Sequence, residues 1–217
     1  IWLFTPERLV VHYHSDIVRQ KMLSFLFKPL ILNTLRKADK IVVSSPNLVK
    51  TSSYLKRFKD KCEVIPFGVN LSQFESYTDK SQVEDLKEKY GSFVLYSGRI
   101  GYYKGLQYLI RAMKEVDANL VLIGEGDQKE KLKGIVTELG MEDKVHFLPF
   151  QSKENLVNFY KAAEVFVLPS VFRSEAFGIV LIEAINVINK DRIDHDIDSL
   201  LRWIDRLPCR KIKSLDF

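Results

Sequence analysis

Two cationic side chains flank a glycine-rich turn near the middle of this 217-residue chain. Arg99 and Lys104 lie in the segment 97–105, which follows the apolar run 93–96 and precedes an amphipathic helical pattern. A guanidinium binds phosphate through two parallel hydrogen bonds, and a flexible ammonium neutralises a leaving group as its charge develops. The pattern favours a diphosphate site, and the alternative is a pair of ordinary surface charges at a turn.

A second strand-loop-helix junction carries two carboxylates and a glycine. Glu175 lies in a loop after an apolar run, and Glu183 falls eight residues later, on about the second turn of the expected helix. The N–H groups of Gly178, Ile179 and Val180 belong to the first turn, where they lack intrahelical acceptors and suit an anion. Both glutamates could accept hydrogen bonds from sugar hydroxyls, although most pairs with this spacing are solvated helix residues.

The histidines offer no spacing that suggests a metal site, and no Asp-x-Asp motif lies beside the two segments described above. His14 follows the first apolar run. It could be a catalytic group or an ordinary histidine at the end of a strand, and both interpretations stay open. His12 is expected to pack within the strand, and Asp16 is expected to cap a helix that begins at Ile17. We therefore expect no bound metal.

Short apolar runs alternate with helical patterns along the chain, which indicates an α/β fold with parallel strands. Ligands of such folds bind beyond the carboxyl ends of the strands, where both charged segments fall. Gly124 and Gly126 follow one such strand and predict a tight turn that lets a nucleotide lie against the backbone. Helices are expected around 83–90, 106–116 and 132–139. The expected strands, each buried on both faces, are 9–13, 40–44, 63–65, 93–96, 120–123, 145–148 and 165–168.

Three motifs in matching order resemble those of the family 4 retaining glycosyltransferases of the GT-B fold. They are G-R-x4-K-G at 98–105, E-x7-E at 175–183 and H-Y-H-S-D at 12–16. The segment 65–70 also resembles the family's passage between domains, and 146–150 occupies the place where such transferases hold the base. The resemblance implies two Rossmann-like domains that face a cleft, both incomplete in this chain.

The resemblance also implies roles for individual residues. Arg99 and Lys104 would stabilise a departing diphosphate. Glu175 would hold sugar hydroxyls, Glu183 would bind the ribose, and His14 corresponds to the histidine of the family's cleft loop, near the transferred sugar. The expected catalytic residues are His14, Arg99, Lys104 and Glu175. The expected donor-binding residues are Gly98, Arg99, Lys104, Glu175, Phe177, Gly178, Ile179, Val180 and Glu183. No cofactor is implied, because the nucleotide-diphosphate sugar, linked to GDP or UDP, is a substrate and the two cations take the place of a metal.

The chain is expected to divide near Asn70, and the resemblance stops after Ala184. The absence of a methionine at Ile1 is interpreted as an incomplete N-terminus. The expected parts are a partial N-terminal acceptor-side domain at 1–70, a truncated C-terminal donor-binding domain at 71–190, and an atypical amphipathic C-terminal helix and tail at 191–217.

Positive charge is concentrated in the first third of the chain. Residues 1–65 carry 12 lysines and arginines against 5 acidic residues, whereas residues 66–150 carry 11 against 13. Aromatic residues are not interleaved with the basic ones, so no nucleic-acid partner is expected, and an anionic membrane surface or a phosphate-bearing acceptor fits better. The apolar run 17–30, interrupted at Pro29, is too short to span a bilayer. A helix with this pattern could lie in the bilayer interface or cover one face of the sheet. Two cysteines and no visible signal peptide predict a cytoplasmic protein, peripheral on the inner face of the cytoplasmic membrane.

These observations together predict a retaining hexosyltransferase that moves a sugar, taken to be mannose, to a saccharide or lipid-linked acceptor. The sequence of residues 12–21 most resembles that of transferases of bacterial envelope polysaccharide synthesis. The alternative is a truncated, non-catalytic nucleotide-sugar-binding or interaction module. A dehydrogenase is disfavoured because no G-x-G-x-x-G opens a strand-helix turn. An epimerase would need more carboxylates around the anomeric centre.

Overall fold

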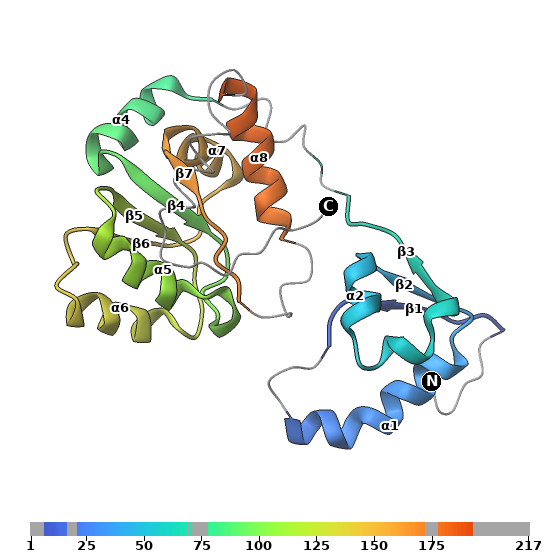
Figure 1. Ribbon diagram of the computed structural model, residues 1–217. Helices are drawn as coiled ribbons and strands as arrows, with labels where there is room; N and C mark the ends of the chain where they lie inside the picture. The colour runs from blue at the N-terminus through green and yellow to red at the C-terminus, as the bar shows by residue number, and fades with distance from the viewer. Residues whose placement is uncertain (1–6, 17–20, 69, 71–77, 172–177, 193–217) are drawn as a thin grey trace. The chain divides into compact units, whose positions relative to one another are not determined.

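The computed structural model describes residues 7–16, 21–68, 70, 78–171 and 178–192 (Figure 1). These residues form two compact units, and the division falls between Gly68 and Val69. The N-terminal unit is drawn from Ile1–Gly68 and Val171–Gly178, and the C-terminal unit from Val69–Ser170 and Ile179–Phe217. The predicted domain roles stay predictions.

The C-terminal unit is built on a four-stranded parallel sheet in the order β6-β5-β4-β7. Its strands are β4 (Phe93–Ser97), β5 (Asn119–Ile123), β6 (Val145–Leu148) and β7 (Val165–Phe166). In the register of the sheet, Leu95 pairs with Val121 on one side and with Phe166 on the other. Every residue of β4 is buried, because helices cover both faces of the sheet.

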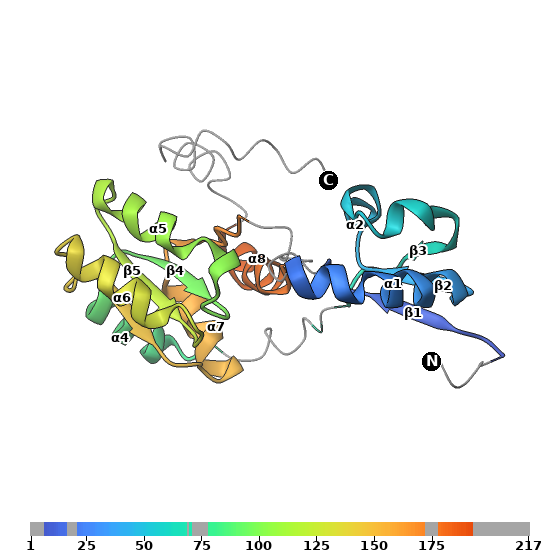
Figure 2. The ribbon, with the colours of Figure 1, turned by 90° about the horizontal axis from the view of Figure 1, so that it is seen from below.

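The helices of this unit lie in two layers, one on each face of the sheet (Figures 1 and 2). Alternate side chains of a strand point to opposite faces. Phe93 and Leu95 therefore pack with α4, α7 and α8, whereas Val94 and Tyr96 pack with α5 and α6. The helices are α4 (Lys80–Tyr90), α5 (Leu106–Ala112), α6 (Lys129–Glu138), α7 (Lys153–Ala162) and α8 (Ile179–Arg192).

A buried asparagine fixes where the chain enters α4. Asn158 of α7 accepts a hydrogen bond from the Asp79 N–H at 3.1 Å and donates to the Gln82 side chain at 2.9 Å. Asp79 also caps α4, because its carboxylate accepts from the N–H groups of Ser81 and Gln82. The start of α4 is thereby held against α7.

The N-terminal unit has a three-stranded parallel sheet in the order β1-β2-β3. Its core contains the buried side chains of Leu35, Ile41 and Leu55. The elements are β1 (Val10–Tyr13), α1 (Lys21–Lys37), β2 (Lys40–Val43), α2 (Pro46–Thr51), the 3₁₀ helices η1 (Leu55–Arg57) and η2 (Lys59–Lys61), and β3 (Cys62–Val64). The prediction of an α/β fold with parallel strands is confirmed in both units.

One expectation for the N-terminal unit needs correction. Burial of every strand on both faces is wrong here, because Val10 and His12 of β1 are exposed. Only the alternate residues, Val11 and Tyr13, pack on the core. Helix α1 continues through Pro29 to Lys37, since a proline removes one intrahelical hydrogen bond but need not end a helix whose other face is packed. Among the helices that the structure describes, none is both long and apolar enough to cross a membrane.

Candidate functional site

The glycine-rich turn leaves the carboxyl end of β4. Gly98 has a φ of 144°, and the turn continues through the 3₁₀ helix η3 (Tyr102–Lys104) to Gly105, whose φ of 70° is left-handed. L side chains rarely adopt either conformation, so glycine is required at both ends of the turn. The turn thereby places Arg99 and Lys104 beyond the end of a parallel strand, where α/β folds bind their ligands.

The two cations of this turn differ in their exposure. Arg99 is exposed, whereas only 6% of the Lys104 surface is accessible. The Lys104 ammonium lies over the Tyr103 ring, with Nζ 5.3 Å from the ring centroid, and the ring quadrupole attracts it there. Because burying a lysine is costly, a polyanion that binds next to the buried Lys104 ammonium would stabilise it.

Tyr96 supports the turn from within the sheet. Its side chain is fully buried, and its hydroxyl donates to the Arg99 carbonyl oxygen at 2.8 Å. The Gly98 N–H donates to the Ile123 carbonyl oxygen at 3.0 Å. These bonds fix the backbone from which the Arg99 side chain projects. The sequence analysis missed Tyr96, and the signal that could have found it is a hydroxyl at a buried strand position just before a glycine turn.

The glycines after β5 make room for the backbone of this turn. A Cβ on Gly124 would lie 2.0 Å from the Gly98 carbonyl oxygen, and one on Gly126 would lie 2.2 Å from the Ile100 carbonyl oxygen. Real Cβ atoms essentially never come closer than 3.0 Å to another heavy atom. The Ile100 N–H also donates to the Glu125 carbonyl oxygen at 2.9 Å. The positions that Cβ atoms would take at these glycines are therefore occupied by the turn after β4, and the approach of a nucleotide to this backbone stays a prediction.

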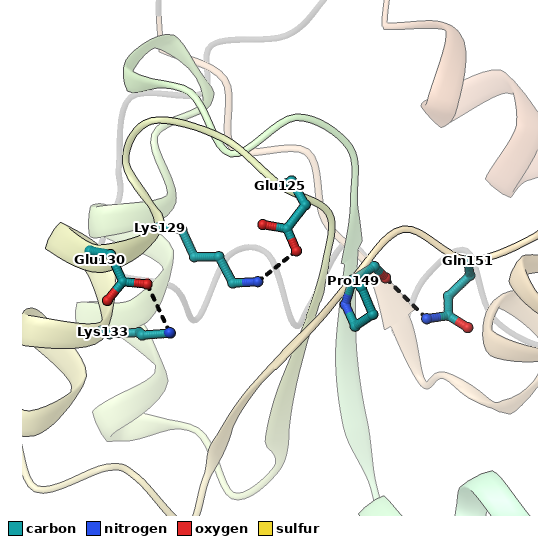
Figure 3. A network of polar contacts seen from close by, with 6 residues as sticks. All are labelled: Glu125, Lys129, Glu130, Lys133, Pro149 and Gln151. Atoms are coloured by element: carbon teal, nitrogen blue, oxygen red, sulfur yellow. Dashed lines mark hydrogen bonds and ion pairs between the residues drawn. The ribbon is translucent and has the colours of Figure 1, made fainter.

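Polar side chains and one exposed ring lie at the carboxyl ends of β5 and β6. Glu125 forms an ion pair with Lys129 at 2.7 Å, and the Gln151 side chain donates to the Pro149 carbonyl oxygen at 3.0 Å. Phe150, between these two loop residues, is 62% exposed. An exposed ring among polar groups could stack on a heterocycle, and base binding by 146–150 stays a prediction. Figure 3 shows the polar contacts of Glu125, Lys129, Glu130, Lys133, Pro149 and Gln151.

Glu183 lies in the second turn of α8, on the side of the helix that faces the core. It precedes the buried Val187 by one helical turn on the same face. Burial raises the pKa of the Glu183 carboxyl group, and the positive charge of Lys153 opposes this shift. A partly desolvated carboxylate gains more from a hydrogen-bond donor than a solvated one does. Ribose binding by Glu183 stays a prediction.

The C-terminal unit brings the turn after β4 and the acidic residue of α8 together. Ser97, the last residue of β4, shares a strand face with Leu95, and α7 and α8 cover that face. The buried side chain of Tyr160 on α7 interacts with both Ser97 and Glu183. Since Arg99 follows Ser97 by two residues, the cationic turn begins near the Tyr160 side chain, on which the charge of Glu183 also acts.

The loop that leads into α8 is only partly described by the structure. Glu175 and Phe177 lie outside the described residues, so their roles stay predictions. Gly178, with a φ of 67°, directly precedes α8, which begins at Ile179. The first N–H groups of a helix, here those of Ile179 and Val180, have no acceptor inside the helix. Anion binding by these three residues also stays a prediction.

In the N-terminal unit, His14 belongs to a cluster of three aromatic rings. The His14 and Phe67 ring centroids are 5.3 Å apart, and His12 lies 5.7 Å from the same phenylalanine ring. Both histidines are exposed. The predicted catalytic role of His14 stays a prediction. Within the ranges that the structure describes, no three His, Cys, Asp or Glu side chains gather as metal ligands would.

Asp16 joins β1 to the turn that follows α2. Its carboxylate accepts from the hydroxyl groups of Tyr13 at 2.7 Å and Ser52 at 2.6 Å. The buried Ser52 oxygen in turn accepts from the N–H groups of Tyr54 and Leu55. Burial and the neighbouring carboxylate raise the pKa of Tyr13, so the phenol stays a donor. The helix residues that Asp16 was expected to cap lie outside the described ranges.

Comparison with known proteins places the chain among the glycosyltransferases. The family model for glycosyl transferases group 1 matches residues 78–187, just over half of the chain. The D-rhamnosyltransferase WbpZ of Pseudomonas aeruginosa is 38% identical over 175 residues, which are 80% of this chain and 45% of that protein. The O-antigen chain mannosyltransferase C of Escherichia coli is 39% identical over 177 residues, 81% of this chain and 47% of that protein. The chain thus spans about half the length of these relatives.

Solved structures show the same fold. A sucrose-phosphate synthase from Thermosynechococcus elongatus matches 81% of this chain with a TM-score of 0.67 at 29% identity, over 47% of its own length. Anabaena Alr3699/HepE in complex with UDP matches 83% of this chain with a TM-score of 0.68 at 20% identity, over 51% of its own length. Both proteins have the GT-B fold, and the chain is similar to them in this fold. With the family model and both relatives in agreement, the chain belongs to the glycosyl transferases group 1 family.

Proposed function

We propose that this chain is part of a retaining glycosyltransferase that moves a hexose from a nucleotide-diphosphate sugar to a saccharide or lipid-linked acceptor in envelope polysaccharide synthesis. The observation that carries the proposal lies in the C-terminal unit, where Ser97, just before the turn that bears Arg99 and Lys104, and Glu183 of α8 both interact with the buried Tyr160. The printed names of two relatives, a D-rhamnosyltransferase and an O-antigen chain mannosyltransferase, support it.

In the proposed reaction, the bond between the anomeric carbon of the sugar and the diphosphate oxygen breaks, and the diphosphate departs with increased negative charge. The Arg99 guanidinium donates two hydrogen bonds to phosphate oxygens, and the Lys104 ammonium neutralises the leaving oxygen. The acceptor hydroxyl attacks the anomeric carbon on the face that the diphosphate leaves and passes its proton to the departing diphosphate oxygen, so the new glycosidic bond keeps the configuration of the donor. These steps need no metal or further cofactor, because the two side chains supply the positive charge.

The remaining proposed contacts orient the donor. Glu183 accepts from the ribose hydroxyls, and the first N–H groups of α8 bind phosphate. Glu175 accepts from hydroxyls of the transferred hexose. Mannose linked to GDP is the proposed donor, since a mannosyltransferase is among the relatives.

A titration followed by a transfer assay tests this proposal. Calorimetry with GDP-mannose and UDP-glucose should show binding of the first at lower concentration than the second. NMR of the product should show the same anomeric configuration as the donor. No binding of either nucleotide sugar would overturn the proposal, and an inverted product would refute the retaining mechanism. Binding without transfer or hydrolysis would instead support a nucleotide-sugar-binding module.

We also propose that α1 contacts an anionic membrane surface. Phe25 and Leu26 are 83% and 68% exposed, Phe27 is exposed beside them, and Lys28 follows. Exposed apolar side chains next to basic ones suit a bilayer interface with anionic headgroups. Sedimentation with anionic vesicles should carry the protein down, and Phe25→Ser with Leu26→Ser should abolish this. Equal sedimentation of the double variant would contradict the proposal.

A further inference from the structure

The Tyr103 ring is packed into the cationic turn by the residues that precede it. A Cβ on Gly101 would lie 3.0 Å from Cε1 and 3.3 Å from Cδ1 of this ring. The φ of Gly101 is −114°, which any residue adopts, so glycine at this position leaves room for the ring and not for an unusual backbone. The Tyr102 ring meets the Tyr103 ring at 80°, with 5.6 Å between the centroids. The Tyr103 ring is therefore held against the backbone of the turn.

The Lys104 ammonium lies over this same ring. Its Nζ is 5.3 Å from the ring centroid, and only 6% of the lysine surface is accessible. A lysine loses hydration when it is buried, and the negative face of an aromatic ring replaces part of that loss. The attraction is stronger at a desolvated site than at an exposed one. The ring thus favours the buried position of the ammonium over positions in water.

A lysine held in this way is prepared to meet a phosphate. Lys104 follows β4, beyond the carboxyl end of the strand, where α/β folds bind their ligands. A lysine side chain is long and flexible, and it loses conformational entropy when a ligand immobilises it. A contact that already holds the ammonium in the free protein reduces this loss on binding, and it thereby raises the affinity for the phosphate that the ammonium meets.

We propose that Tyr103 is a positioning residue whose ring face holds the Lys104 ammonium for the β-phosphate of a nucleoside diphosphate. The ring thereby strengthens the preference of the site for diphosphates over monophosphates. The proposal rests on the proposed function, since it takes Lys104 to neutralise the departing diphosphate. The leaving oxygen belongs to the β-phosphate, which a nucleoside monophosphate lacks. The face of the ring, and not the tyrosine hydroxyl, is the part that acts.

Two substitutions of Tyr103 separate the ring face from the hydroxyl. Calorimetry with GDP and GMP, and with UDP and UMP, gives the ratio of diphosphate to monophosphate affinity. Tyr103→Phe keeps the ring face and should keep this ratio within about twofold of the wild-type value. Tyr103→Leu removes the ring face and should lower the ratio by roughly tenfold, through weaker binding of the diphosphate.

A series of fluorinated phenylalanines at position 103 tests the same point with little change of shape. Each added fluorine weakens the negative potential of the ring face, so the ratio should fall stepwise along the series. A ring that only packs on Gly101 would give the same ratio throughout, and its loss would weaken diphosphate and monophosphate binding alike. The series also decides the question if Tyr103→Leu does not fold.

A double-mutant cycle with Lys104→Met shows whether the ring acts through the ammonium. Once Lys104 is replaced, Tyr103→Leu should change the ratio by less than about twofold, because the effects of interacting residues are not additive. Lys89→Met is the matched control, since the Lys89 ammonium lies 5.2 Å from the Tyr90 ring centroid. Lys89 is exposed and precedes the amino end of β4, so the control should leave the ratio unchanged.

The outcomes separate this inference from the proposed function. If the wild-type chain binds neither GDP nor UDP, both are overturned. If the wild type prefers diphosphates, and both Tyr103→Leu and the fluorinated series keep that preference, only the role of the tyrosine is wrong. A Tyr103→Phe variant that loses as much as Tyr103→Leu would show that the hydroxyl acts and not the ring face. A loss that persists in full after Lys104→Met would show that the ring does not act through this lysine.

Discussion

The contact between the two glycine turns of the C-terminal unit makes a sharp prediction about Gly124→Ala. The new Cβ would lie 2.0 Å from the Gly98 carbonyl oxygen and 3.0 Å from its carbonyl carbon. Because both clashing atoms belong to backbone, no side chain can rotate away, and the turn must move by about 1 Å to restore normal contact. The φ of 144° adds strain for any L side chain.

The expected cost follows from these two effects. Overpacking in a rigid site costs about 1–3 kcal/mol, and an unfavourable backbone conformation costs about 1–3 kcal/mol more. The free energy of unfolding should therefore fall by roughly 3 kcal/mol in urea denaturation. Nucleotide affinity should fall as well, because the displaced atoms belong to the turn that carries Arg99.

The chain provides a matched control in Gly134→Ala. This glycine lies inside α6, and a Cβ there would meet nothing within 4 Å. Alanine is the better helix former, so the same substitution should stabilise the protein by about 0.4–1 kcal/mol. A Gly124→Ala variant as stable as the wild type would refute the close approach of the two turns.

Three further predictions follow from single side chains. Lys104→Met should lower the transfer rate by about 100-fold or more, since loss of one transition-state donor costs ~3 kcal/mol. The control Lys133→Met, which removes a cation from the exposed ion pair with Glu130, should leave the transfer rate unchanged. Equal rates for wild type and Lys104→Met in a steady-state assay would contradict the role of Lys104. Because burial raises the pKa of Glu183, the folded protein keeps this proton to a higher pH than the unfolded chain does. Stability should thus fall as pH rises from the ordinary value of 4.5 through the raised one, and Glu183→Gln should flatten that slope in urea denaturation; an unchanged slope would count against the buried carboxyl group. Ser52→Ala should destabilise the protein by about 1–3 kcal/mol, because it leaves buried N–H groups and Asp16 without their partner; thermal unfolding unchanged from wild type would show those hydrogen bonds to be dispensable.

Much of the fold could be predicted from the sequence because the strands are local and strongly apolar. The run 93–96 is apolar at every position, as is typical of a central parallel strand with helices on both faces, and every residue of β4 is buried. Helix periodicity likewise predicted α5 and α6. The exposed face of β1 could not be predicted, since it depends on which elements cover the sheet and not on the strand's own residues.

The candidate site was predictable to a smaller degree. The spacing of residues predicted Arg99, Lys104 and Glu183 as site residues, because glycines and charged residues that follow apolar runs can be recognised in the sequence. Tyr96 could not be predicted as a supporting residue, because its position in an apolar run indicates only burial, and its hydroxyl reaches the Arg99 carbonyl oxygen only in the folded chain. Glycine spacing also could not tell whether a nucleotide or a neighbouring turn would fill the space beside residue 124.

Hydrogen exchange with mass spectrometry tests the central claim most directly, because it reports which segments a nucleotide covers. On addition of GDP or UDP, exchange should slow together in peptides that span 98–105 and 178–184, and it should stay unchanged in α6. These two segments are the ones proposed to share one diphosphate and its ribose. Slower exchange in only one of them, or in neither while the nucleotide is bound, would contradict the account.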